Sequence, residues 1–257
     1  MSSGGWHVMS SNNESIGKTL AVVVSLCLVC AVIVSLTSVQ LRPLQKANKA
    51  KDIQSNILAA AGISKVDNVA ETFEAKIETR FIDMQSGDFA DPVEDFDFEK
   101  SKYDAELSKS LKENGIKDIA GIQRITKRAP VYISKKDDGS TDAIILPIQG
   151  YGLWGLMYGF ISLESDGETI KDIIFYKHNE TPGLGGEIQN PQWTATWEGK
   201  ELPIQIVKGT AGGDEHKIDG LSGATLTSNG VDHAVDFWTG ENGFGPFLAK
   251  VRNGALK

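Results

Sequence analysis

The sequence predicts an α+β protein, with a single N-terminal transmembrane helix followed by a mostly antiparallel sheet and flanking helices. Three features of the 257-residue chain support this prediction. An uncharged apolar segment stands near the N-terminus, apolar residues at helical spacing follow it, and short apolar runs bounded by Gly, Pro and Asp fill the second half. The predicted divisions are a flexible leader (1–18), a transmembrane helix (19–40), a membrane-proximal helix-rich region (41–128) and the sheet-containing domain (129–257).

The segment from Thr19 to Gln40 contains no charged residue. It is long enough to cross a hydrocarbon core about 30 Å thick at about 1.5 Å per residue. No small-residue cleavage site of a secretory signal precedes Arg42, so we expect the segment to remain as an anchor in the lipid bilayer. Cys27 and Cys30 lie inside it, where thiolate chemistry would lack water, and we interpret both as apolar packing residues.

Charge gives two further expectations. Lys18 is the only Lys or Arg before the apolar segment, whereas Arg42, Lys46, Lys49 and Lys51 follow it, so the positive-inside rule alone places the large domain in the cytoplasm. The whole chain carries 34 acidic and 26 basic residues and a formal charge of -8. Without a concentrated basic stripe, nucleic acid is not an expected partner.

Apolar spacing predicts helices across the region between 51 and 114. A loop interrupts them over 88–100, because Pro92 disfavours the helical conformation of the residue before it. The predicted helical faces are Ile53, Ile57, Leu58 and Ala61, then Val69, Phe73, Ile77 and Phe81, and then Tyr103, Leu107 and Leu111.

Short apolar runs at 131–134, 143–148, 154–164, 170–178 and 202–207 predict the strands of the sheet. A closing helix is expected after them, with Thr227 or Ser228 as its N-cap. Its buried face would comprise Val231, Ala234, Val235 and Trp238, which recur at helical spacing.

The stretch from Gly150 to Gly155 matches G-x-G-x-x-G, the dinucleotide-binding pattern. That pattern needs a helix to open at its last glycine, but 156–163 continues as a strand, so we interpret it as a hairpin turn. Tyr151 and Trp154 would offer flat faces to a ring-shaped ligand, or would simply pack against the sheet.

A second glycine-rich segment, HNETPGLGG from His178 to Gly186, follows a predicted strand. Such a loop can present backbone amides to a planar heterocycle or an anion, with Glu180 or Thr181 adding a side-chain hydrogen bond, but an ordinary long turn explains it equally. His178 and His216 with Glu180, Glu215 or Asp214 lack the spacing of a metal site, and no metal is predicted.

The third segment, DGLSGAT from Asp219 to Thr225, carries the strongest signal. Small residues and two hydroxyls stand directly before a helix N-terminus, whose free amides and dipole favour a phosphate. The residues alone leave two interpretations open, a phosphate-binding turn and a helix cap. Ser222 lacks the G-x-S-x-G environment of a hydrolytic nucleophile, and no catalytic residue is predicted.

DGLSGAT and HNETPGLGG, together with the single anchor, resemble the FMN-binding domain family, and within it the flavoprotein subunits of bacterial sodium-translocating NADH:quinone oxidoreductases. The resemblance covers the anchor and about 129–238, and is looser over 51–114. It implies that a separate flavin transferase, using FAD and a divalent cation, attaches FMN as a phosphoester to Thr225. Small Gly223 and Ala224 would admit that hydroxyl to the transferase.

The resemblance also implies the remaining site and the role. Beside Thr225, the cofactor-binding residues would be Ser222, Gly223, Ala224, Thr227, Tyr151, Trp154, Glu180, Thr181, Gly183, Leu184, Lys208 and Thr210. The chain would relay electrons from NADH toward ubiquinone as part of a translocase, without a substrate site of its own. Its partners would be the other subunits, in the bacterial inner membrane, with the flavin domain on the periplasmic side despite the local charge count.

Two alternatives remain open from the sequence. The equivalent flavoprotein subunit of the Rnf electron-transport complex has the same anchor and motif. A membrane-tethered binding or scaffold protein without flavin would use the hydroxyl-rich turn merely as a helix cap.

Overall fold

The computed structural model describes residues 16–64 and 66–256. These residues divide into two compact units, the first ending at Ala50 and the second beginning at Lys51. Helix α1 (Ile16–Ala60) supplies the first unit and continues into the second. Its residues Ile16 to Lys18, which fall within the predicted leader, are helical; the rest of the predicted leader lies outside the described residues. Among the described residues, α1 is the one helix whose length and composition would allow it to cross a membrane.

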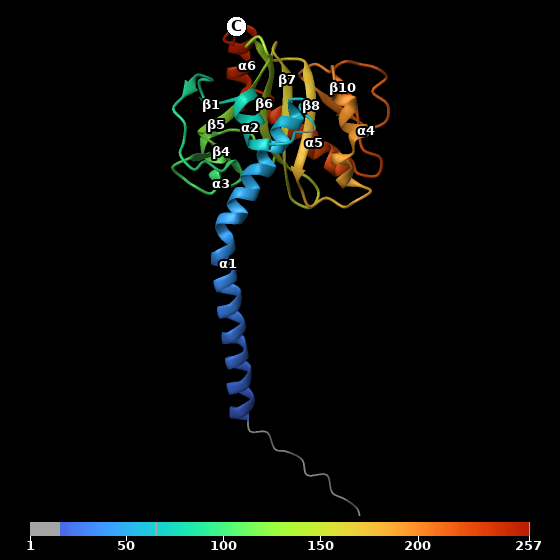
Figure 1. The fold of residues 1–257 in the computed structure, drawn as a ribbon. Helices are drawn as coiled ribbons and strands as arrows, with labels where there is room; N and C mark the ends of the chain where they lie inside the picture. The colour runs from blue at the N-terminus through green and yellow to red at the C-terminus, as the bar shows by residue number, and fades with distance from the viewer. Residues whose placement is uncertain (1–15, 65, 257) are drawn as a thin grey trace, which may run out of the picture. The chain divides into compact units, whose positions relative to one another are not determined.

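The second unit is built on a six-stranded sheet with the order β2–β1–β5–β6–β7–β8, whose strands are drawn as arrows in Figure 1. All of its strand pairs are antiparallel, which confirms the predicted fold class. The strands are β1 (Ile77–Asp83), β2 (Phe89–Ala90), β5 (Arg128–Lys135), β6 (Thr141–Tyr151), β7 (Leu156–Glu164) and β8 (Ile170–Lys177).

Both faces of the sheet are covered, and side chains of β6 and β8 alternate between two cores, as the period of a strand requires. On β6, Ile144, Leu146 and Ile148 join the larger core with residues of α5 (Thr225–Thr239) and α6 (Gly245–Arg252). Ala143 and Ile145 point the other way, into a smaller core with Ile57 and Leu58 from the end of α1. The predicted apolar face of 53–61 therefore packs on the sheet.

Short elements complete the second unit. The helices are α2 (Val69–Lys76), α3 (Phe98–Ser101) and α4 (Pro191–Thr194), with 3-10 turns at Lys112–Asn114, Gly185–Gln189 and Ala195–Trp197. A parallel pair joins β9 (Gln205–Val207) to β10 (Lys217–Asp219), and an antiparallel pair joins β3 (Ser108–Ser110) to β4 (Arg124–Thr126). The loop expected over 88–100 contains the two-residue strand β2 and the one-turn helix α3.

Two predicted helices are wrong. The helix expected through Ile77 and Phe81 ends at Lys76, and Ile77 begins β1, which pairs along its whole length with β5. The segment from Tyr103 to Leu111 contains β3 and no helix. The first error arises because apolar residues four positions apart, such as Ile77 and Phe81, share a face in a strand as well as in a helix. Pairing with neighbouring strands decided between the two.

Candidate functional site

Three segments of the second unit converge at one end of the sheet. They are the turn between β6 and β7, the loop that follows β8, and the first turn of α5. The turn closes after the pair Tyr151–Leu156, with the Gly152 amide donating to the Gly155 carbonyl at 2.8 Å. The G-x-G-x-x-G stretch is thus a hairpin turn, as predicted.

The Glu180 carboxylate joins all three segments. One oxygen, Oε1, accepts hydrogen bonds from the backbone amides of Leu153 and Trp154 at 3.0 and 2.9 Å. The other, Oε2, accepts from the hydroxyl of Thr227 at 2.5 Å. Glu180 is 4% exposed and Thr227 is 1% exposed, so these bonds are shielded from water. We call Glu180, Thr227, Gly152 and Gly185 the anchor cluster.

The glycines of this region provide room for close contacts. A Cβ at Gly152 would lie 2.6 Å from Glu180 Oε1, and a Cβ at Gly185 would lie 2.5 Å from the Thr227 hydroxyl oxygen. Helix α5 approaches the hairpin in the same way, because a Cβ at Gly230 would lie 2.4 Å from the Tyr151 carbonyl oxygen. Each of these distances is too short for a real side-chain carbon. A Cβ at Gly230 would displace the hairpin backbone, and one at Gly152 or Gly185 would displace the Glu180 carboxylate or the Thr227 hydroxyl.

Helix α5 begins at Thr225, whose side chain is exposed. Its N-cap is Ala224, which makes no side-chain capping bond. The prediction that Thr227 or Ser228 caps the helix is wrong, because both lie inside the first turn. Thr227 donates to Glu180, and the Ser228 hydroxyl accepts from the Leu221 amide at 2.9 Å, which holds the DGLSGAT turn against the helix.

Apolar side chains stand exposed on the same three segments. Trp154 is 62% exposed, and Leu226 directly follows Thr225. Leu184 lies next to the DGLSGAT turn, because its Cδ2 would be 3.3 Å from a Cβ at Gly223. Exposed apolar side chains on neighbouring segments are typical of a ligand or partner surface. We call this set the exposed rim: Tyr151, Leu153, Trp154, Leu184 and Leu226.

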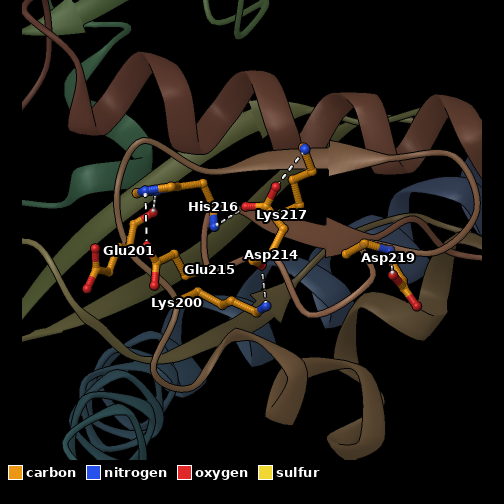
Figure 2. Close-up of polar contacts among 8 residues, drawn as sticks. Lys200, Glu201, Asp214, Glu215, His216, Lys217 and Asp219 are labelled. Atoms are coloured by element: carbon orange, nitrogen blue, oxygen red, sulfur yellow. Dashed lines mark hydrogen bonds and ion pairs between the residues drawn. The ribbon is translucent and has the colours of Figure 1, made fainter.

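The loop between β9 and β10 is ordered by its own acidic side chains, as Figure 2 shows. Asp214 pairs with Lys217 at 2.6 Å, and this lysine holds the pKa of the Asp214 carboxyl below its usual value. Asp219 accepts a hydrogen bond from the amide of Ala211. The loop meets the DGLSGAT turn through the backbone, since the Gly220 amide donates to the Val207 carbonyl at 2.8 Å.

A cluster of Glu201, Glu215 and His216 lies on this loop and the strand edge beside it (Figure 2), with potential ligand atoms all within 4.8 Å of one another. His216 Nδ1 donates to the Glu201 carbonyl at 2.9 Å, and this bond, with the nearby acidic groups, raises the pKa of His216. Glu215 is exposed, and such surface groups are common without an ion. His178 and Glu180 are bonded elsewhere, because His178 Nδ1 accepts from the amide of Glu180.

The predicted cofactor residues fall into three sets, which lie around the first turn of α5, in the loop after β8 and in the loop after β9. One group is brought together around the first turn of α5, and it comprises Ser222, Gly223, Ala224, Thr225, Thr227, Tyr151, Trp154, Glu180 and Leu184. Gly183 and Thr181 belong to the same loop as Glu180, and the Thr181 carbonyl accepts from Leu184 and Gly186. Lys208 and Thr210 are exposed in the loop after β9, linked to this region through Val207.

Sequence reasoning missed Gly152, Gly185, Gly230 and Leu226. The glycines were visible as a pattern, but only the fold shows that each faces a named atom of another segment. Leu226 gave no signal, because a single leucine beside a threonine matches any amphipathic helix.

The described residues fit a flavin phosphate. Thr225 offers an exposed hydroxyl at the N-terminus of a 15-residue helix, where the helix dipole and free amides favour a phosphate. The exposed rim offers apolar and aromatic surface for a planar ring on the three segments that meet at this end of the sheet. Gly223 adopts φ 74°, a conformation that side chains rarely adopt, so the turn itself stays open and small.

Comparison with known proteins agrees with this arrangement. Residues 152–240 match the model of the FMN-binding domain. The class is therefore a flavoprotein with an FMN-binding domain that follows a helix able to cross a membrane.

Relatives then define the particular family. The chain is 49% identical to the C subunit of the Na(+)-translocating NADH-quinone reductase of Yersinia pestis, over 96% of this chain and 97% of that protein. It is 50% identical to the protein of the same name from Vibrio vulnificus (strain YJ016), over 96% of this chain and 99% of that one. The crystal structure of Shewanella oneidensis NqrC matches with a TM-score of 0.75 at 31% identity, covering 81% of this chain and 100% of that one. The chain belongs to the NqrC family, the C subunits of Na(+)-translocating NADH-quinone reductases.

Proposed function

We propose that the chain carries FMN covalently, as a phosphoester on the Thr225 hydroxyl. The observation that supports this assignment most directly is the contrast in the first turn of α5. The side chain of Thr225 is exposed, whereas the Thr227 hydroxyl is buried against Glu180 and the Ser228 hydroxyl accepts from Leu221. Thr225 is thus the threonine of this turn that a second protein can reach.

Attachment requires a flavin transferase with FAD as donor. A bond forms between the Thr225 hydroxyl oxygen and the FMN phosphorus, the diphosphate bond of FAD breaks, and AMP leaves. The hydroxyl proton passes to a base of the transferase. The small residues Gly223 and Ala224 beside Thr225 leave space for the transferase to approach. The N-terminus of helix α5 stabilises the phosphate that results.

When bound, FMN supplies reversible electron transfer between partners of different potential. The chain's own residues hold and surround it. Tyr151, Trp154, Leu184 and Leu226, which are exposed, would cover apolar parts of the ring and exclude water. The loop of Thr181 and Gly183 would contribute at another edge. Lys208 and Thr210 are assigned to the phosphate or the flavin from the neighbouring loop.

Within its complex the chain relays electrons from NADH toward ubiquinone without a substrate site of its own, as part of a sodium-translocating enzyme. Helix α1 would anchor it in the inner membrane, with the flavin domain on the periplasmic side and the other subunits as partners. Near-full-length similarity to the NqrC relatives favours this role over the Rnf complex.

The test is the intact mass of the purified chain from hosts with and without the transferase, followed by peptide mapping. We expect a mass increase of FMN less one water only with the transferase, on the peptide that contains Thr225. A chain that stays unmodified in both hosts would contradict the proposal and favour a flavin-free scaffold.

A further inference from the structure

We propose that Glu180 is the positioning residue of this site: its buried carboxylate sets the distance between the Trp154 hairpin turn and the first turn of α5. This inference rests on the proposed function for its purpose, but its structural content is independent of the flavin. The sequence suggested Glu180 or Thr181 as the source of a side-chain hydrogen bond to the ligand; the geometry points to a different role for Glu180.

Both carboxylate oxygens are already used within the protein. Oε1 accepts from the amides of Leu153 and Trp154, and Oε2 accepts from the Thr227 hydroxyl. Hydrogen bonds to an ionised acceptor are stronger than neutral ones, and more so away from water. A side chain that is 4% exposed and bonded at both oxygens joins segments of the protein rather than contacting a ligand.

The surrounding backbone is shaped to this carboxylate. A Cβ at Gly152 would lie 2.6 Å from Oε1, and a Cβ at Gly185 would lie 2.6 Å from Oε2. Two glycines from two segments thus leave room for the same group. An acidic side chain that had merely turned inward would not need such room on both sides.

The position of Glu180 links the two halves of the proposed flavin site. On one side it holds the amide of Trp154, whose ring is exposed on the rim. On the other it holds Thr227, two residues after Thr225 in the same helical turn. Loss of the carboxylate would leave two backbone amides and the buried Thr227 hydroxyl without their acceptor, and would release both segments together.

Three substitutions separate geometry from charge. Glu180→Ala removes every bond. Glu180→Gln keeps an oxygen that can accept from Leu153 and Trp154, and its amide group can donate to the Thr227 oxygen. Thr227→Val removes only the bond on the helix side, with little change in volume. The matched control is Glu187→Ala, because Glu187 lies in the same loop but bonds Asn190 within that loop.

The first measurement is hydrogen exchange of the full chain without flavin. For Glu180→Ala we expect exchange to rise roughly tenfold in both 153–154 and 225–228, the change that corresponds to about 1.4 kcal/mol. Glu180→Gln should restore most of the protection, and Glu187→Ala should change neither segment. If Glu180→Ala does not fold, Thr227→Val should raise exchange in 225–228 alone.

The second measurement is flavin occupancy of Thr225 and the visible circular dichroism of the bound flavin, with the transferase present. Both should fall in Glu180→Ala and recover in Glu180→Gln. Unchanged exchange in Glu180→Ala, or a Gln variant as defective as Ala, would overturn the inference. An unmodified Thr225 in the unsubstituted chain would instead overturn the proposed function, while the exchange result would still decide the role of Glu180.

Discussion

The exposed rim and the anchor cluster come from the same three segments, yet they have opposite chemistry. The rim presents apolar side chains to solvent, whereas the anchor cluster buries a carboxylate among hydrogen-bond donors. Two threonines in one helical turn illustrate the difference, since Thr225 is exposed and Thr227 is bonded to Glu180. Residues that act on a ligand and residues that hold the site in place are thus adjacent in sequence but separated by burial.

The largest loss of stability should come from a side chain at Gly230, where helix α5 packs against the backbone of the hairpin. Gly230→Ala would place a Cβ 2.4 Å from the Tyr151 carbonyl oxygen, so α5 must move away from the hairpin. We expect a loss of about 2–3 kcal/mol in the free energy of unfolding, measured with urea. The exposed neighbour is the control: Asn229→Ala should change it by less than about 0.5 kcal/mol. Equal effects would mean that this contact does not constrain the helix.

The same substitution at the two threonines tests the comparison directly. Thr227→Val leaves a buried Glu180 oxygen without its donor and should cost about 1–3 kcal/mol in the free energy of unfolding. Thr225→Val, at an exposed position, should change it by less than about 0.5 kcal/mol. Urea unfolding of both variants without flavin provides the measurement. A larger loss at Thr225 would reverse the roles assigned to the two residues.

A rim substitution should affect the ligand and spare the fold. Because the Trp154 ring is 62% exposed, Trp154→Ala should alter the free energy of unfolding by less than about 0.5 kcal/mol. The flavin on Thr225 should then become more fluorescent, since an aromatic ring beside a flavin quenches it. Unchanged fluorescence at full occupancy would remove Trp154 from the flavin site.

Asp172 on β8 offers a contrast to Glu180, because it is half-buried and accepts from only one backbone amide, that of Ile173, in the described structure. Burial, with Glu198 nearby, raises the pKa of Asp172 from 3.8 to about 6. The folded protein therefore holds this proton more tightly than the unfolded chain, and stability falls as pH rises from about 4 through 6. At pH 7.5, Asp172→Asn should raise the free energy of unfolding by roughly 1 kcal/mol, a value discounted for solvent screening. At pH 4 the same substitution should leave the free energy of unfolding almost unchanged. Thermal unfolding at both pH values provides the measurement, and a similar increase at both would contradict this explanation.

The sequence predicted the parts whose physical signal is local. The uncharged stretch of α1 and the strands β5 to β8 are marked by short or long apolar runs, and the buried face of α5 follows a helical period. The failures lie where periodicity is ambiguous, as in β1, or where tertiary contacts decide, as in the role of Thr227. The resemblance to the FMN-binding domain supplied the candidate residues, but only the fold shows that Glu180 faces inward.

The central claim is that the exposed threonine carries the flavin while the buried one holds the helix. The most direct test is peptide mapping of Thr225→Ala after expression with the flavin transferase, beside Thr227→Val as the matched variant. We expect no flavin on any residue of 222–228 in Thr225→Ala, and flavin retained on Thr225 in Thr227→Val. Flavin found on Thr227 or Ser222 of the Thr225→Ala chain would contradict it.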